Sequence, residues 1–412
     1  MLDEGRQTFR FDTFGSEDFW GGTLKLHSAI SGTANGGVGA GVSPATALSV
    51  GLKVDLDALP ADLVTQLKNG TVNLNDPATT LALLKLNAVV GVTGFFDAAG
   101  KLTSLGIQCA FCHSTVDDAL VPGIGHRLDG WNNQDLNVGA IVNLSPDLTP
   151  VATLLSPALP GITQDTVRTV LQSWGPGKFD AELFMDGKAF NTNQTVNSVV
   201  TGTNVPAATL IPPAYGLAGV NLHTSAGWGS VTYWNAFVGN LEMHGKGTFF
   251  DPRLNNPTKY PVATAAGFFN VRSNPDLVTS KLASLQMYQL NIPAPTPPAG
   301  SFDAAAADRG KLVFNGKGQC ATCHVPPLFT EPGWNMHTPP EVGVDSFQAD
   351  RSPDGRYRTT PLKGLWSHMK RGFYHDGRFA TLADVINHYD TLGTLGLTAQ
   401  EKTDLAEYLK SI

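Results

Sequence analysis

The spacing of apolar positions predicts helices most clearly in the last hundred residues. Residues 303–314 alternate alanine, leucine, valine and phenylalanine with charged positions and lead directly into Cys320. Residues 399–412 predict a closing helix, because Leu405 and Leu409 are spaced i, i+4 and therefore share one face. Two amphipathic helices are thus expected to bracket the C-terminal region.

A third helix is predicted between these two, over residues 381–389. Thr381 is an expected N-cap, since its side chain can accept a hydrogen bond from a free backbone N–H of the first turn. Asp384 falls in that first turn, where a carboxylate interacts favourably with the helix dipole.

The first 290 residues are less regular, but four segments predict local structure. They are an amphipathic helix at 16–30, a β-hairpin at 87–109 with its turn at 97–100, a helix at 163–174 ended by glycine and proline, and a surface insertion at 191–205. No repeat of short period is present. The only duplication is a coarse one, with one cysteine motif in each half.

A proline-rich stretch marks the clearest boundary along the chain. Residues 291–300 contain four prolines, a composition that favours an extended, semi-rigid linker. We therefore expect an N-terminal extension at 1–108 that carries the hairpin, an N-terminal domain at 109–290 and a C-terminal domain at 301–412.

Composition narrows the possible functions. The 412 residues are 42% hydrophobic and 15% charged, so a sizeable core is available. The formal net charge of -7 and the lack of a basic run argue against nucleic acid as a partner. No window approaches eighteen uninterrupted apolar residues, so no transmembrane segment is expected. A small redox protein or another electron donor remains a suitable partner, and the acidic balance would favour a basic one.

Two CxxCH motifs account for all four cysteines. They are Cys109-Ala-Phe-Cys112-His113 and Cys320-Ala-Thr-Cys323-His324. This spacing is the attachment signature of c-type haem, in which the thiols bind the haem covalently and the histidine ligates the iron. Zinc binding and redox chemistry are the alternatives for each CxxC pair. Here each pair is followed at once by histidine and the pairs lie far apart, so the sequence predicts two covalently attached haems c.

The expected fold class follows from these observations. It is mainly α, with two cytochrome c-type haem domains, long loops and a small β-hairpin element in the N-terminal region. His113 and His324 are the expected proximal iron ligands, and function depends on what occupies the opposite side of each iron.

The distal ligands stay open at this stage. For the first haem, His126 follows the motif by 13 residues in a loop and is the leading candidate, with His223 and His244 as further options. For the second haem the candidates are Met336, His337, His368, Met369, His375, His388 and Tyr389. Spacing alone does not choose among them.

The C-terminal region resembles a known family. Residues 358–366, RTTPLKGLW, and 372–382, GFYHDGRFATL, are similar to segments of bacterial di-haem cytochrome c peroxidases and their MauG-like relatives, which also include rubber oxygenases. In the peroxidases a methionine on the following helix ligates the high-potential haem. The equivalent position here is Tyr389, as in the MauG-like branch. The resemblance therefore implies Tyr389 as a distal ligand, with His388 as its competitor.

The N-terminal half resembles the family less. Residues 184–189, FMDGKA, are similar to a family segment whose tryptophan lies between the haems, but Met185 stands in its place. Trp131, Trp228 or Trp234 are alternatives for that role. Residues 241–243, LEM, are similar to a glutamate-methionine pair, which implies Glu242 as the acid/base at a peroxide site.

Three functions are compatible with the sequence. The first is a peroxidase or peroxide-driven oxidase that uses H2O2, the second a non-catalytic electron carrier, and the third a rubber-oxygenase-like enzyme that uses O2. A zinc hydrolase is excluded because no HExxH motif occurs. Residues 1–5, MLDEG, look like a start methionine placed on a mature chain, and c-type haem is attached outside the cytoplasm. We therefore expect a periplasmic or secreted protein.

Overall fold

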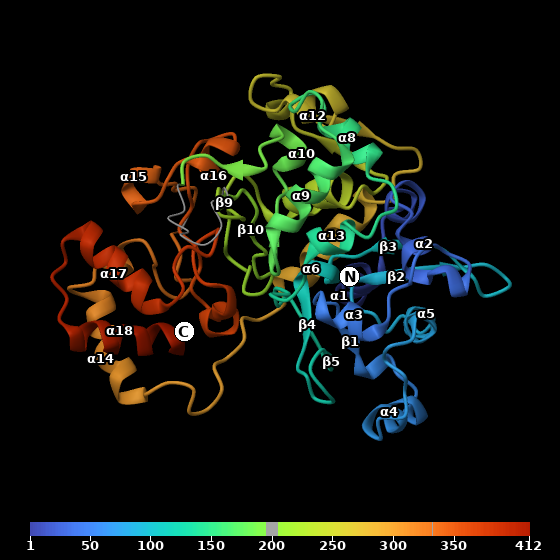
Figure 1. The fold of residues 1–412 in the computed structure, drawn as a ribbon. Helices are drawn as coiled ribbons and strands as arrows, with labels where there is room; N and C mark the ends of the chain where they lie inside the picture. Colours follow the sequence, from blue (N-terminus) through green and yellow to red (C-terminus); the bar gives the residue numbers. More distant parts are fainter. Residues whose placement is uncertain (195–204, 332) are drawn as a thin grey trace. The chain divides into compact units, whose positions relative to one another are not determined.

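The computed structural model describes residues 1–194, 205–331 and 333–412. The described chain divides into two compact units (Figure 1). The first unit contains Met1–Ala189 and Asn235–Gln289, and the second contains Phe190–Trp234 and Leu290–Ile412. Each unit carries one CxxCH motif.

This division differs from the boundaries expected from the sequence. The N-terminal 108 residues share a unit with the first motif, because strand β1 (Val54–Asp55) pairs in parallel with β5 (Ile124–Gly125). Residues 190–234 belong with the second motif, since the backbone N–H of Arg358 donates to the Ser225 carbonyl at 3.0 Å. Contacts between residues far apart in the sequence do not change the local amino-acid composition, so the division at residues 189–190 could not be predicted from the sequence.

The first unit is built from short helices joined by long loops. Its helices are α1 (Leu2–Phe11), α2 (Leu26–Ser31), α3 (Pro44–Ser49), α4 (Ala61–Lys68), α5 (Pro77–Lys85), α6 (Ala110–His113), α7 (Val138–Val142), α8 (Thr149–Leu155), α9 (Gln164–Trp174), α10 (Leu183–Asp186) and α12 (Pro261–Ala266). Its other strands are β2 (Val92–Phe96), β3 (Leu102–Ile107), β4 (Ser114–Val116), β6 (Arg127–Asp129), β7 (Lys178–Phe179), β11 (Thr248–Phe250) and β12 (Asn270–Arg272). Helices α11 (Val231–Phe237) and α13 (Leu282–Leu290) each span a division point of the chain.

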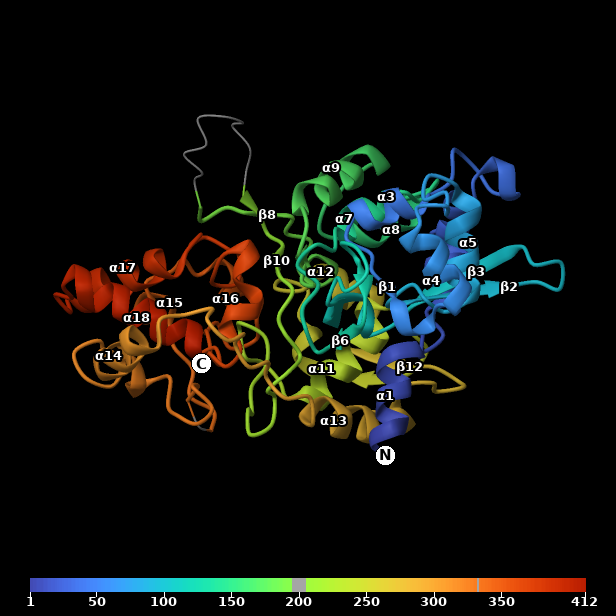
Figure 2. The same cartoon turned by 90° about the horizontal axis from the view of Figure 1, so that it is seen from below.

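The predicted β-hairpin is confirmed. Strands β2 and β3 pair antiparallel from Val92 opposite Ile107 to Phe96 opposite Leu102. The turn lies at the predicted residues, where the N–H of Asp97 donates to the Lys101 carbonyl at 3.0 Å. Figure 2 shows the hairpin as a projecting ribbon with α5 beside it.

The helix predicted at 163–174 is also confirmed. Helix α9 begins after Thr163, whose side chain accepts from the Thr166 N–H, and it ends at Gly175, which has a φ of 73°. A positive φ is readily adopted by glycine, so the breaker seen in the sequence ends the helix as predicted.

The single amphipathic helix predicted at 16–30 is wrong. The segment instead forms a π-helical turn at Asp18–Thr23 and the short helix α2, with Lys25 between them at a φ of 52°. Gly21 packs directly on β3, where a Cβ atom would lie 1.8 Å from the Ser104 hydroxyl oxygen. This close approach buries Trp20, and tertiary packing therefore overrides the helical periodicity.

The second unit contains the helices predicted from the C-terminal pattern. Its elements are β8 (Phe190–Asn191), β9 (Val205–Pro206), β10 (Thr209–Leu210), α14 (Ala304–Asn315), α15 (Pro339–Val342), α16 (Phe347–Arg351), α17 (Leu382–Gly393) and α18 (Ala399–Ser411). Thr381 caps α17 and exchanges hydrogen bonds with Asp384, as predicted. Leu405 and Leu409 are both buried in the core of this unit.

Helices α14 and α18 lie side by side (Figure 1). Their closest approach is at Gly310, where a Cβ atom would lie 2.0 Å from the Asp404 carbonyl oxygen. The Arg309 guanidinium closes the same crossing with two hydrogen bonds to the Asp404 carboxylate, at 2.7 and 2.9 Å. The first and last helices of the unit are thus joined beside the cysteine motif that follows α14.

The described part of the chain is mainly helical, and its antiparallel sheets are two-stranded pairs such as β4 with β6 and β11 with β12. Residues 291–298 form no helix or strand, in agreement with the proline-rich composition. Most of the insertion predicted at 191–205 lies outside the described residues. Within the described residues, we find no helix with the length and hydrophobicity required to cross a bilayer.

Candidate haem sites

The first motif is held at the base of the hairpin. Cys109 precedes α6, and the Cys109 carbonyl accepts from the N–H of His113 at 3.1 Å. Gly91 lets the hairpin approach this turn, since a Cβ atom there would lie 2.1 Å from Cα of Phe111. Burial raises the pKa of Cys109 to about 12 and also raises the pKa of Cys112.

The structure brings Glu242 to this motif. Glu242 ends a π-helical turn at Val238–Glu242, and its charge contributes, after burial, to the raised pKa of Cys112. Burial, followed by the nearby Glu182 carboxylate, raises the pKa of Glu242 to about 8. A carboxyl group with a pKa near neutrality is suited to move protons, whereas an ordinary glutamate would stay ionised.

His244 lies two residues beyond Glu242 among aromatic side chains. Its ring stacks on Phe19 with centroids 3.7 Å apart, and Phe184 meets it edge-on at 6.4 Å. Burial lowers the pKa of His244 to about 4, so the imidazole is neutral at physiological pH. His244 therefore offers a neutral nitrogen in the same part of the unit as Glu242.

His126 is placed elsewhere. Its side chain is 52% exposed, and its Nδ1 lies 2.8 Å from a carboxylate oxygen of Asp57. This partner raises the pKa of His126 and favours the charged form, which cannot ligate iron. His223, the other option from the sequence, belongs to the second unit, with its Nε2 3.2 Å from the Val220 carbonyl oxygen. The structure thus does not bring His126 or His223 to the first motif.

The structure describes the surroundings of Met185 and of two tryptophans considered for the position between the haems. Met185 and Met243 are buried in the first unit. Trp228 and Trp234 stack with centroids 5.3 Å apart and an interplanar angle of 21°, and both lie in the second unit.

The second motif provides a histidine in the tautomer that iron requires. Cys320 opens a 3-10 turn, Cys320–Thr322, that leads to His324. The Nδ1 of His324 lies 3.0 Å from the carbonyl oxygen of Phe329, and because a carbonyl only accepts, Nδ1 must carry the proton. Burial lowers the pKa of His324, so the ring is neutral and Nε2 holds the lone pair. Iron-ligating histidines commonly donate their other N–H to a backbone carbonyl in this way.

Tyr389 lies near the thiols of this motif. Burial raises its pKa, and the nearby Cys323 and Cys320 add to that rise. The competing His388 points elsewhere, because its Nε2 lies 2.9 Å from the Val342 carbonyl oxygen. Tyr374 stands behind Tyr389 with ring centroids 6.3 Å apart. Of the two neighbours on α17, Tyr389 is therefore the one presented to the second motif.

The remaining candidates for the second haem are held by other groups. Met336 packs against Gly227, His375 stacks on Tyr357 with centroids 5.3 Å apart, and Met369 packs on the core of the unit. His368 lies in a 3-10 segment, Leu365–Arg371, and burial lowers its pKa to about 4.

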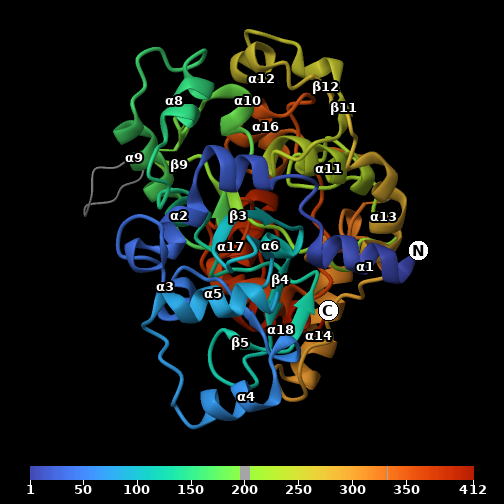
Figure 3. The same ribbon diagram turned by 90° about the vertical axis from the view of Figure 1, so that its right-hand side faces the viewer.

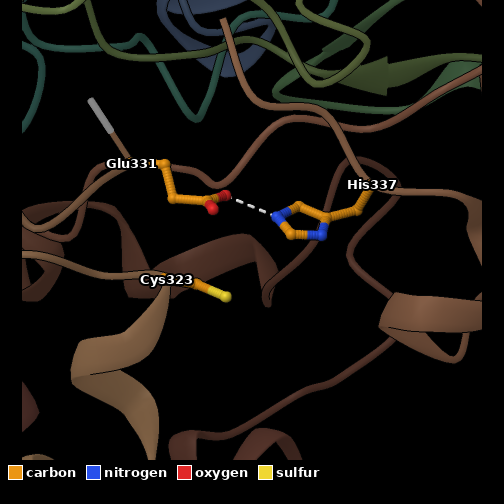
Figure 4. A group of neighbouring side chains, drawn as sticks. All are labelled: Cys323, Glu331 and His337. Atoms are coloured by element: carbon orange, nitrogen blue, oxygen red, sulfur yellow. Dashed lines mark hydrogen bonds and ion pairs between the residues drawn. The ribbon is translucent and has the colours of Figure 1, made fainter. Parts of the chain in front are cut away.

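A polar cluster lies beside Cys323. The thiol sulfur, a Glu331 carboxylate oxygen and a His337 ring nitrogen all lie within 4.8 Å of one another (Figure 4). Glu331 and His337 form a hydrogen-bonded pair, and the Thr359 hydroxyl donates to Glu331 at 2.6 Å. A thiol, a carboxylate and an imidazole can together bind a metal ion, but the thiol of Cys323 also belongs to a complete CxxCH motif.

Arg358 supplies a buried positive charge near this cluster. It donates to the Leu222 carbonyl at 2.6 Å, while within the part of the chain that the structure describes its Nε has no hydrogen-bond partner. Burial is the cause that lowers its pKa to about 10, with no carboxylate offsetting it. A buried guanidinium in this state fits the carboxylate of a haem propionate.

Both sites therefore fit a covalently attached haem c. Each has two partly buried thiols followed by a histidine. The second adds a neutral imidazole, a tyrosine near the thiols and a buried cation. Glu182, Glu331 and Arg358 were not assigned from the sequence, because they lie at no fixed spacing from either motif.

Comparisons with known proteins agree with this assignment. No protein-family model matches the chain. The methylamine utilization protein MauG of Methylorubrum extorquens is 27% identical over 155 residues, covering 33% of this chain and 43% of the relative. Cytochrome-c peroxidase IdrP1 of Denitromonas iodatirespirans is 26% identical over 152 residues, covering 26% and 40% respectively. The chain thus spans less than half the length of either curated relative.

A solved structure, the hydrazine synthase of Kuenenia stuttgartiensis, matches with a TM-score of 0.31 and 17% identity, covering 50% of this chain and 72% of that one. A score this low carries no argument about the fold. These partial sequence matches support the resemblance to the MauG-like superfamily.

Proposed function

We propose that this protein is a di-haem c-type cytochrome that acts as a peroxidase or peroxide-driven oxidase, with electron transfer between its two haems. Cys109 and Cys112 would hold one haem, and Cys320 and Cys323 the other. The observation that carries the proposal is Glu242, a carboxyl group beside the first motif whose pKa is raised to about 8. An electron carrier has no need for such a group.

Each residue then has a defined task. His113 and His324 would be the proximal ligands, and Tyr389 would be the distal ligand of the second haem. The bound haem supplies an iron centre that can accept peroxide and exchange electrons. Glu242 would take the proton of an incoming H2O2 and return it to the outer oxygen. Its apolar surroundings favour this role, because they keep the neutral and ionised forms close in free energy.

Partners and location follow from the same proposal. Electrons would come from a small redox protein or another donor, and H2O2 or O2 would be the small-molecule substrate. Attachment of haem to CxxCH places the mature protein in the periplasm or outside the cell.

The proposal is tested by low-temperature EPR of the fully ferric holo-protein, followed by stopped-flow mixing with H2O2. A variant lacking the second attachment site, Cys320→Ala with Cys323→Ala, assigns each signal to its haem. We expect two haems per chain, a high-spin signal from the first haem and a rapid spectral change with H2O2. Two low-spin haems in both the ferric and half-reduced states, with no reaction, would contradict the proposal and indicate an electron carrier.

A further inference from the structure

The first unit contains an apolar cavity that the proposed peroxide chemistry does not use. Its volume is about 90 Å³, and its walls include Trp20, Ala47, Leu84, Phe111 and Ile141. Protein interiors are normally packed with few voids larger than a water molecule, so a hollow of this size calls for an occupant or a role.

The cavity lies between elements that surround the hairpin. Helices α3 and α5 lie side by side in Figure 3 and contribute Ala47 and Leu84, while α7 contributes Ile141. The hairpin strands contribute Val92 and Leu105. The hollow is therefore formed by several elements of one compact unit.

The position of the cavity relates it to the first haem. Phe111 is the residue between the two cysteines of the first motif, and its buried side chain forms part of the wall. Neither thiol lines the cavity, and nor does His113. The hollow is thus distinct from the space next to the thiols, and it reaches the attachment segment at Phe111.

The wall determines which molecules the cavity accepts. Four lining residues carry polar groups, and three of them have partners. Lys53 pairs with Asp135 at 3.0 Å, Thr46 bonds to the Ser43 hydroxyl at 3.1 Å, and Trp20 Nε1 donates to the Met243 carbonyl at 3.0 Å. The fourth, Thr80, is buried, and among the described residues its hydroxyl has no hydrogen-bond partner. Water needs two or more polar partners to occupy such a site, whereas small apolar molecules and xenon enter dry cavities readily.

We propose that this cavity binds a small apolar molecule of the size of dioxygen and holds it beside the first haem. H2O2 would not accumulate there, because it would lose most of its hydrogen bonds on entering. The cavity would therefore bind a second, apolar substrate or product of the haem chemistry. This proposal does not depend on the peroxide reaction.

The test uses xenon as the probe on the complete holo-protein, by crystals under xenon pressure and by ¹²⁹Xe NMR in solution. Ala47→Leu fills the hollow, while Ala45→Leu adds the same volume on the same helix at a position that does not line it. Thr80→Val preserves the volume and removes only the hydroxyl.

We expect one xenon atom between Ala47 and Phe111 in the wild type, retained in Thr80→Val and Ala45→Leu and lost in Ala47→Leu. Ile141→Phe is a second filling variant, should Ala47→Leu fail to incorporate haem. Absence of xenon from the wild-type cavity would overturn the proposal. So would xenon binding in Ala47→Leu and Ile141→Phe that equals the binding in the wild type. Neither result tests the role of Glu242, so the cavity proposal can fail while the proposed peroxidase function stands, and the reverse is also true.

Discussion

The Nδ1 of His126 lies 2.8 Å from the Asp57 carboxylate, and this pair decides against His126 as an iron ligand. Because the pair is exposed, it should matter little to the first haem. We predict that His126→Ala leaves the absorption and EPR spectra of that haem unchanged, whereas His113→Ala abolishes its ordinary axial coordination. A change of spin state in His126→Ala would show that the loop folds over the iron in the holo-protein.

The same pair makes a prediction about pH. Asp57 raises the pKa of His126 above its ordinary value of 6.5, so the folded state binds the proton more tightly than the unfolded chain. This contribution to stability is fully present below the unfolded pKa and is lost as the pH rises through the folded pKa. The difference in unfolding free energy between wild type and Asp57→Asn should therefore be larger at pH 5.5 than at pH 9. These two pH values lie roughly one unit below and more than two units above the ordinary pKa of histidine. Urea titrations at both values measure it.

Tyr389 is predicted to control the spectrum of the second haem. If its phenol oxygen ligates the iron, Tyr389→Phe should remove the charge-transfer absorption of the ferric state and raise the reduction potential, since an anionic ligand stabilises ferric iron. Tyr408→Phe is the matched control, because Tyr408 packs on Phe314 in the same unit with ring centroids 5.2 Å apart. Identical spectra in the two variants would assign Tyr389 to packing.

Glu242 is predicted to set the pH dependence of the reaction with H2O2. Its ionised form is the base, and with a pKa of about 8 the rate constant should rise with pH and level off above that value. Glu242→Gln should lower the rate constant by about 10²- to 10⁴-fold and flatten the profile. Glu401→Gln, at the exposed start of α18, is a control that should leave both unchanged. A profile in Glu242→Gln that still follows the wild type would exclude this role.

The raised pKa of Glu242 also affects stability, with the opposite sign from an ordinary carboxylate. The folded state keeps a proton that the unfolded chain releases, so stability should fall as the pH rises from about 4.5 to about 8. Glu242→Gln should reduce this fall. Denaturation of the haem-loaded wild type and variant at matched pH values measures the difference, and parallel curves would contradict the assigned pKa.

The crossing of α14 and α18 gives a prediction about the second unit alone. Gly310→Ala places a Cβ atom against the Asp404 carbonyl oxygen. That oxygen belongs to the backbone of α18, so the clash is relieved only if the helices move apart. We expect a loss of about 1–3 kcal/mol in the free energy of unfolding. Lys311→Ala, at the exposed neighbouring position, should change it by less than about 0.5 kcal/mol. Equal stability of the two variants would show that the helices can separate without cost.

Local signals in the sequence were sufficient for the motifs and for several elements. The two CxxCH motifs, the hairpin with its turn at 97–100, and the helices capped by Thr163 and Thr381 depend on neighbours within a few residues. The segment at 16–30 failed for the opposite reason. There, Gly21 lets a remote strand approach, and burial of Trp20 outweighs the helical period.

The sequence by itself determined the two CxxCH motifs on which the proposed haem attachment depends, because cysteine spacing and the adjacent histidine are properties of consecutive residues. Only the tertiary structure decided which side chains surround each motif. Glu242 lies near Cys112 although 130 positions separate them in the chain, and Tyr389 lies near the second pair of thiols. The direction of each side chain, and the burial that shifts its pKa, depend on packing between distant segments. No local pattern encodes that packing.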